Sequence, residues 1–236
     1  TRFKCDWSSD VCSSDLEGWL PVLQQKSGNP KVQNGQPGMF WATEGQTLVG
    51  RMNSSGSPFE GDVHPQGNPH VQANPQRLAQ VARDLARRMA TLWPDQAAAV
   101  QDRLQGFEQR WQAHMARWQG QAQGLRGKTV AAQHTYFTYL WEWLGMTQVA
   151  DLEPKPGLTP SPAHLQQVMQ RLRDQTPRVW GLAVVKHQDP RAARWMQQQL
   201  PGLAVWSWQG TVGQATEEGL VQWFDQMLTD LNKGGS

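Results

Sequence analysis

The sequence is poor in residues that several classes of protein require. Cysteine occurs only twice in 236 residues, at Cys5 and Cys12. Both lie in residues 1–16, a Ser- and Asp-rich leader that resembles a translated sequencing adapter and that we expect to be non-native. Without these two residues the chain has no cysteine, so the sequence predicts neither a structural disulfide nor a dithiol redox site.

Long apolar runs and blocks of like charge are also missing. No segment approaches the roughly 18 consecutive apolar residues that a membrane-spanning helix needs. The 22 Lys and Arg residues against 20 Asp and Glu give a net charge of +2, and the basic residues are spread along the chain. Nucleic acid is therefore not expected as a partner. Hydrophobic residues make up 38% of the chain, which is enough for one large domain or two lobes.

The common signatures of catalysis are absent from the sequence. It has no Gly-rich phosphate loop, no nucleophile elbow and no His-Glu-x-x-His pattern, and no pair of catalytic carboxylates is evident. We therefore do not expect an enzyme.

Two of the six histidines, His64 and His70, lie in segment 61–75, which reads Gly-Asp-Val-His-Pro-Gln-Gly-Asn-Pro-His-Val-Gln-Ala-Asn-Pro. Its prolines and glycines disfavour helix and strand, so the segment is expected to be a loop. Imidazoles in such a loop fit one edge of a metal site. They also fit a surface turn that carries two incidental histidines, and this segment alone favours that interpretation because histidine spacing without cysteine or a helix is a weak zinc signature.

Helical patterns flank this loop. A short amphipathic helix is expected at 17–26 and a brief strand near 47–49. Asn74-Pro75 is typical of a helix start, and apolar residues then recur every three or four positions. A second helix, capped by Asp95, is expected at 95–123. Its roughly 28 residues at 1.5 Å each would form a rod of about 40 Å, the length of a whole lobe.

Strand and helix patterns alternate in the remainder of the chain. Strands are expected at 129–133, 148–152, 179–185 and 203–208, and helices at 135–144, from 162, at 190–200 and at 217–232. This alternation predicts a doubly wound α/β lobe with a mainly parallel sheet. Ligands bind such sheets beyond the carboxyl ends of the strands, and His134 directly follows the first strand. By position alone, His134 also fits a capping or core histidine.

Three motifs in this order resemble those of the periplasmic zinc- and manganese-binding proteins of ABC transporters. They are Gly61-Asp-Val-His-x-x-Gly-Asn-Pro-His70, Val130-x-x-x-His134-x-x-x-x-Tyr139 and Glu153-Pro-Lys-Pro-Gly-x-x-Pro-Ser-Pro-Ala-His-Leu165. The resemblance covers about residues 17–236. It implies an α/β fold of two lobes joined by one long rigid helix, with the metal held between the lobes by histidines and usually a carboxylate.

The resemblance also implies a division of the chain and a set of metal ligands. The expected parts are the leader at 1–16, the remnant of a truncated first lobe at 17–93, the connecting helix at 94–126 and the second α/β lobe at 127–236. His70 matches the first-lobe ligand and His134 the second-lobe ligand, whereas His64 is either an accessory ligand or a loop residue. A further family histidine would lie in sequence that the leader replaces.

The carboxylate that usually follows the last strand in this family has no counterpart in residues 208–216. Glu217 and Glu218 are the nearest acids, but both equally suit the first turn of a helix, where the helix dipole favours negative charge. The ligand shell is therefore expected to be incomplete and zinc binding to be weak.

The resemblance implies the substrate-binding component of an ABC transporter, which captures Zn²⁺, or alternatively Mn²⁺, in the interlobe cleft for uptake. Its expected partners are the divalent ion and a membrane permease, and a periplasmic monomer is expected. Two other classes stay open. One is a zinc-dependent hydrolase, which would need an open coordination position and a base. The other is a helical interaction module built on residues 76–123.

Overall fold

The structure is a computed structural model that describes residues 13–50 and 66–234, with side chains described from residue 20 onward. His64 lies outside the described residues, so its expected role as an accessory ligand is not addressed by the structure. The helices are α1 (Ser13–Lys26), α2 (Pro75–Leu92), α3 (Ala97–Gln121), α4 (Thr138–Leu144), α5 (Pro162–Asp174), α6 (Arg191–Gln199) and α7 (Glu217–Lys233). The strands are β1 (Thr129–Ala132), β2 (Thr147–Asp151), β3 (Leu182–Val185) and β4 (Val205–Trp208). Short 3-10 turns are η1 (Pro30–Val32), η3 (Val71–Ala73), η4 (Pro94–Gln96), η5 (Gln123–Leu125) and η6 (Thr135–Phe137).

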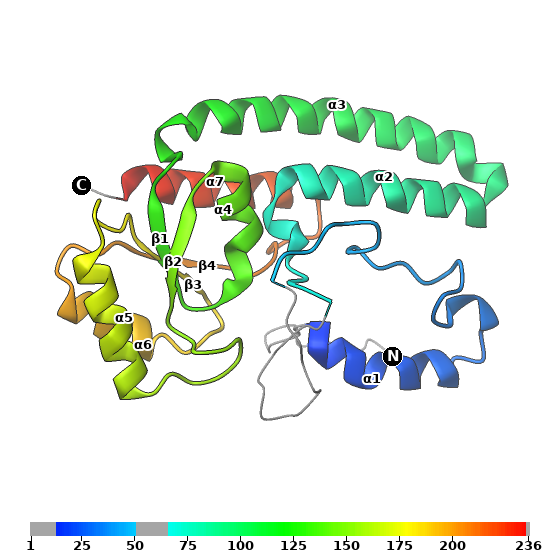
Figure 1. The fold of residues 1–236 in the computed structure, drawn as a ribbon. Helices are drawn as coiled ribbons and strands as arrows, with labels where there is room; N and C mark the ends of the chain where they lie inside the picture. The colour runs from blue at the N-terminus through cyan, green and yellow to red at the C-terminus, as the bar shows by residue number, and fades with distance from the viewer. Residues whose placement is uncertain (1–12, 51–65, 235–236) are drawn as a thin grey trace.

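The two long helices α2 and α3 form an antiparallel pair, and α3 continues past α2 to lie along α7 (Figure 1). Asn74 caps α2 as predicted, because its side-chain oxygen accepts hydrogen bonds from the backbone N–H groups of Gln76 and Arg77. The prediction that Asp95 caps the next helix is wrong. Pro94 first opens η4, and α3 then begins at Ala97. Its 25 residues give a length of about 37 Å at 1.5 Å per residue.

Two other predictions for the N-terminal part need correction. The first helix begins at Ser13 rather than at residue 17, in a Ser-Ser-Asp sequence of the kind that favours helix starts. The strand expected near 47–49 does not form. Instead of pairing with a strand, the backbone of Val49 accepts a hydrogen bond from the N–H of Asn68 at 2.8 Å and donates one to the Tyr139 hydroxyl at 3.2 Å.

The four strands form one sheet that is parallel, as the alternating pattern predicts, and their order is β2-β1-β3-β4. Alternate residues of the strands face opposite sides of the sheet. Val130 and Ala132 pack in one core cluster with α3, α4 and α7, whereas Ala131 packs in the other cluster with α5 and α6. Both faces of the sheet are thus covered by helices, which is the doubly wound arrangement (Figure 1).

The larger core cluster extends beyond the sheet into α3. Trp118 is fully buried and its ring lies 4.9 Å from that of Phe224 on α7, while Trp111 lies 5.9 Å from the same ring. The core cluster around the sheet therefore includes residues of α3. Within residues 13–50 and 66–234, none of the helices combines the length and apolar character needed to cross a bilayer.

Candidate metal centre

His134 lies where an open parallel sheet offers a ligand site. It lies two residues after the end of β1, and the chain leaves β1 for β2 on one side while β3 lies on the other side. The carboxyl ends of β1 and β3 thus flank the point at which the strand order reverses. The backbone of His134 is extended, with φ −135° and ψ 159°, and its side chain is buried.

His70 approaches His134 from the loop before α2. The two ring centroids are 5.6 Å apart, with an angle of 74° between the ring planes. Two imidazoles that bind one tetrahedral zinc through nitrogens at about 2.0–2.1 Å have ring centroids about 5 Å apart, so the observed spacing is close to that of a shared metal. The structure thus brings together two of the three histidines that the sequence analysis selects.

A carboxylate holds the ring of His134 in place. Nδ1 of His134 lies 2.8 Å from Oε2 of Glu153, which also accepts the backbone N–H of Gly157 at 2.8 Å. The side chain of Glu153 is only 10% exposed. A carboxylate on Nδ1 fixes the tautomer with the proton on that nitrogen and leaves the Nε2 lone pair to bind a metal.

An aromatic ring supports His70. Tyr136 stacks on it with ring centroids 4.0 Å apart, and the Nε2 atom of His70 is shielded from solvent. The Tyr136 hydroxyl donates a hydrogen bond to the carbonyl oxygen of Gly210 and accepts one from Gln72 at 2.9 Å. The ring therefore connects the His70 loop with the loop that follows β4.

A partly buried acid, Asp151, ends β2 at the same edge of the sheet. Burial raises the pKa of its carboxyl group, although a hydrogen bond from Gln148 and the nearby His134 act in the opposite direction.

No third ligand joins the two histidines in the part of the chain that the structure describes, where no group of three or more His, Cys, Asp or Glu side chains is arranged to hold a metal. Glu217 instead forms an ion pair with Arg110 at 2.7 Å, and hydrogen bonds from that guanidinium hold the pKa of the Glu217 carboxyl below its usual value. Glu218 accepts a hydrogen bond from Gln222 on the same helix. Both acids thus lie in the first turn of α7 and bind other side chains there, away from the two histidines.

The remaining histidines lie outside this centre. His114 stacks on Trp118 at 5.7 Å, and His164 lies in the first turn of α5, with Nε2 3.2 Å from the carbonyl oxygen of Asp151. His187 is exposed in the loop between β3 and α6. These positions agree with the structural roles of packing and helix start rather than with ligation at the sheet edge.

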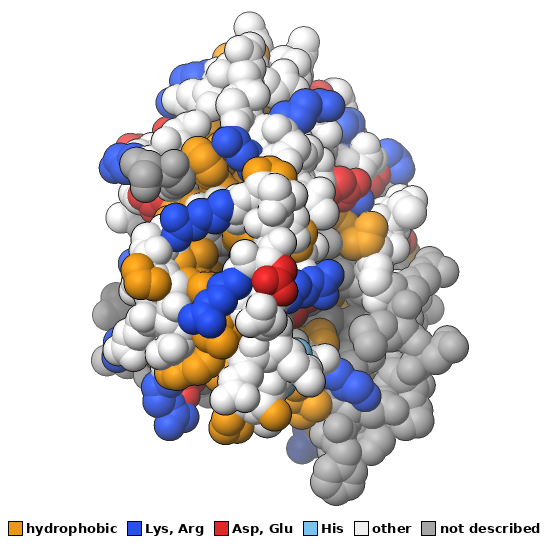
Figure 2. All heavy atoms as spheres, turned by 60° about the vertical axis from the view of Figure 1, so that its left-hand side comes forward, with side chains coloured by type: hydrophobic (Ala, Val, Ile, Leu, Met, Phe, Trp, Pro, Cys, Tyr) orange, Lys and Arg blue, Asp and Glu red, His pale blue; other side chains and the backbone are white. Residues whose placement is uncertain are grey.

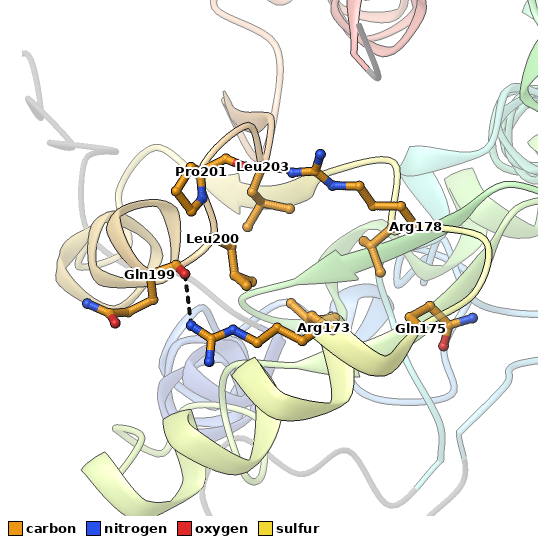
Figure 3. A pocket seen from close by; sticks show the side chains of 9 residues that line it. Arg173, Gln175, Arg178, Gln199, Leu200, Pro201 and Leu203 are labelled. Atoms are coloured by element: carbon orange, nitrogen blue, oxygen red, sulfur yellow. Dashed lines mark hydrogen bonds between the residues drawn. The ribbon is translucent and has the colours of Figure 1, made fainter.

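A surface depression of about 480 Å³ lies between α5 and α6, at the opposite end of the sheet (Figure 3). Its two arginines bind the end of α6, because Arg173 donates to the carbonyl oxygen of Gln199 at 3.1 Å and Arg178 donates to that of Pro201 at 2.8 Å. The apolar residues at its base, among them Leu172 and Leu203, are already buried. The depression is therefore explained by the capping of α6 and is separate from the histidine pair.

The sequence motifs did not indicate a role at this centre for Glu153, Tyr136 or Asn68, although Glu153 and Asn68 belong to two of those motifs and Tyr136 lies two residues after His134. The signal for Glu153 is positional. It follows β2 as His134 follows β1, and parallel neighbouring strands end at the same edge of a sheet. The contact of Tyr136 with His70 has no comparable signal in sequence spacing.

Comparison with known protein families matches almost the whole chain to one family. The model of ZnuA, the periplasmic component A of the zinc-uptake complex, covers residues 11–234. The chain belongs to this family, whose members are the metal-binding components of ABC transporters and bind zinc and manganese. They bind their solute without converting it, so the protein is a binding protein and not an enzyme. No curated protein matches the chain.

Solved structures show the same fold. A crystal structure of ZnuA aligns with a TM-score of 0.73 at 15% identity, over 94% of this chain and 76% of that chain. FpvC of Pseudomonas aeruginosa in complex with Mn²⁺ aligns with a TM-score of 0.67 at 18% identity, over 86% and 72%. The Zn(II)-bound E280Q variant of AdcAII from Streptococcus pneumoniae aligns with a TM-score of 0.61 at 19% identity, over 80% and 69%. The predicted family and the predicted two-lobed α/β fold are confirmed.

Family membership also defines the general setting of the protein. Proteins of this family bind divalent metal ions, work with ABC transporter permeases and act in the periplasm or outside the cell. The hydrolase and the helical interaction module, the two alternative functions left open by the sequence, are thereby replaced by metal capture for uptake.

Proposed function

We propose that this chain captures Zn²⁺ through His70 and His134 at the carboxyl edge of the sheet. The observation that carries the proposal is the convergence of the two buried rings, with centroids 5.6 Å apart, while Glu153 holds Nδ1 of His134. Neutral imidazole suits zinc, whereas additional carboxylates would favour manganese. Zinc is therefore the preferred ion of this centre, and Mn²⁺ should bind more weakly. His64 remains a predicted accessory ligand.

The expected division of the chain becomes part of the proposal. We propose that α3 lies within a connecting segment, residues 94–126, between a first-lobe remnant at 17–93 and the second lobe at 127–236. Its packing against α2 at one end and α7 at the other supports this role (Figure 1).

We further propose that the protein is a periplasmic monomer that does not bind nucleic acid. The net charge of +2 supports the last part. So does the face in Figure 2, on which basic side chains are scattered among apolar and neutral ones. Light scattering at micromolar concentration tests the monomer, since a mass of twice 26.6 kDa would contradict it.

Calorimetric titration with Zn²⁺ tests the proposed site. The parent chain should bind one zinc ion weakly, and His134→Ala should abolish binding. His114→Ala is the matched control, because this histidine packs on Trp118 in α3 away from the centre, and its removal should leave zinc affinity unchanged. Zinc binding by His134→Ala as tight as that of the parent would refute the site.

A further inference from the structure

The side chain of Asn68 bridges the two histidine-bearing segments. It is buried, with 8% of its surface exposed. Its Oδ1 accepts the backbone N–H of His70 at 2.9 Å, and its Nδ2 donates to the carbonyl oxygen of Thr135 at 2.6 Å and to the hydroxyl of Thr138 at 3.1 Å. One amide thus fixes the backbone of His70 to the residues that directly follow His134.

The backbone of Asn68 strengthens the same connection. Its carbonyl oxygen accepts the hydroxyl of Tyr139, the second residue of α4, at 2.7 Å. The preceding residue, Gly67, has φ +113°, a region that L side chains rarely adopt. A Cβ atom there would lie 2.7 Å from Cβ of Leu48 and 2.9 Å from the carbonyl oxygen of Val49. The turn that brings Asn68 onto α4 therefore requires glycine at this position.

Through these contacts the His70 loop is attached to residues 135–139 of the second lobe, although in the sequence His70 precedes the connecting helix. We propose that Asn68 is a positioning residue that docks the His70 loop onto residues 135–139, so that the two-imidazole half of the metal centre is assembled before metal arrives. This inference rests on the proposed zinc site and adds its preorganisation. Ligands held in place in advance lose less conformational freedom on binding, so their affinity for the ion is higher.

Asn68→Ala removes the bridge without touching either histidine. We expect zinc affinity to fall about 10- to 100-fold, as for other groups that orient metal ligands. Asn74→Ala is the matched control. Asn74 is also a buried asparagine near His70, but its side chain accepts hydrogen bonds only from the first turn of α2. It should lower the melting temperature and leave zinc affinity within about twofold of the parent.

Two further measurements separate positioning from general destabilisation. In a His70→Ala background, Asn68→Ala should cause no additional loss of zinc affinity, because the residue acts through His70. With saturating Co²⁺ as a probe, the visible spectrum of Asn68→Ala should keep the shape of the parent spectrum, because His70 still ligates once metal is bound, whereas the spectrum of His70→Ala should change. Tyr139→Phe keeps the ring and removes only the hydroxyl, so it should weaken zinc binding by a smaller factor than Asn68→Ala does. This variant also tests the proposal if Asn68→Ala does not fold.

The outcomes distinguish this inference from the proposed function. Equal zinc affinity of the parent and His70→Ala would overturn the proposed site itself. Loss of affinity in His70→Ala, together with parental affinity in Asn68→Ala and Tyr139→Phe, would retain the site and refute the role of Asn68. A further loss from Asn68→Ala in the His70→Ala background would also refute it, because the effect would then not pass through His70.

Discussion

Replacement of Glu153 tests how much of the affinity for zinc comes from the carboxylate behind His134. Glu153→Gln keeps the length of the side chain and an oxygen that can accept from His134 and Gly157, but it removes the negative charge. The carboxylate is only 10% exposed, so water screens its effect on the imidazole weakly. Loss of such a partner typically lowers metal affinity 10- to 100-fold, which corresponds to about 1.4 to 2.7 kcal/mol.

Glu153→Gln should lie near the lower end of this range and Glu153→Ala near the upper end, since alanine also frees the ring to rotate. Zinc affinity is measured by competition with a chromophoric chelator at constant pH and ionic strength. Glu142→Gln is a suitable control, because Glu142 lies on α4 and pairs with Arg77 at 3.0 Å, but half of its side chain is exposed. If both Glu153 variants bound zinc as the parent does while His134→Ala did not, the carboxylate would have no part in ligation.

Three further predictions concern the framework. Trp111→Ala should lower the free energy of unfolding by about 3–5 kcal/mol in denaturant titrations, because Trp111 is fully buried and donates to the carbonyl oxygen of Pro75 at 2.8 Å; a loss below about 1 kcal/mol would contradict this. The lowered pKa of the Glu217 carboxyl stabilises the folded state above about pH 4.3, and this stabilisation is lost as the pH falls through the lowered pKa. The free energy of unfolding of Glu217→Gln should therefore fall less steeply with acidification than that of the parent, and an equally steep fall in both would contradict this. A fragment of residues 97–236 should melt at a higher temperature than one of residues 127–236, since α3 completes the core, and equal melting temperatures would argue against a shared core.

The regular elements of the second half could be predicted because their patterns are local. The buried strand β3 is an apolar run, and Ser161 caps α5 through a hydrogen bond from the N–H of His164. Element ends were less predictable. The strand β3 begins three residues later than expected, at Leu182 rather than at 179, because pairing with β4 starts only at the match of Leu182 with Val205. A strand ends where its partner does, and residue spacing contains no information on the partner.

The loops around the metal centre were the least predictable part. Residues near 47–49 have the composition of a strand, yet their polar backbone groups bind Asn68 and Tyr139, which lie far away in the sequence. Tyr136 contacts Gly210 and His70 by similarly long-range interactions. Periodicity detects which face of an element is buried, but it does not identify the residue on the other side of a contact.

The two halves of the centre differ in this respect, and the difference follows from how each histidine is held. The pairing of β1 with β2 determines which residues surround His134. The pair Ala132 and Asp151 is the last in register between β1 and β2, and the hydrogen bond from the N–H of Glu153 to the carbonyl oxygen of Gln133 continues the ladder beyond it. Two residues past that pair, His134 faces Glu153. Once the order β2-β1 is known, this contact follows from register alone.

His70 has no such template. Its place depends on the glycine turn at Gly67 and on the buried amide of Asn68, whose hydrogen-bond partners belong to η6 and α4. The order of dependence is therefore fixed by the contacts: the sheet positions His134 and the segment after it, and that segment in turn positions His70. A substitution that weakens the start of α4 should consequently reduce zinc affinity through both ligands, whereas one that weakens the His70 loop should leave the contact between His134 and Glu153 intact.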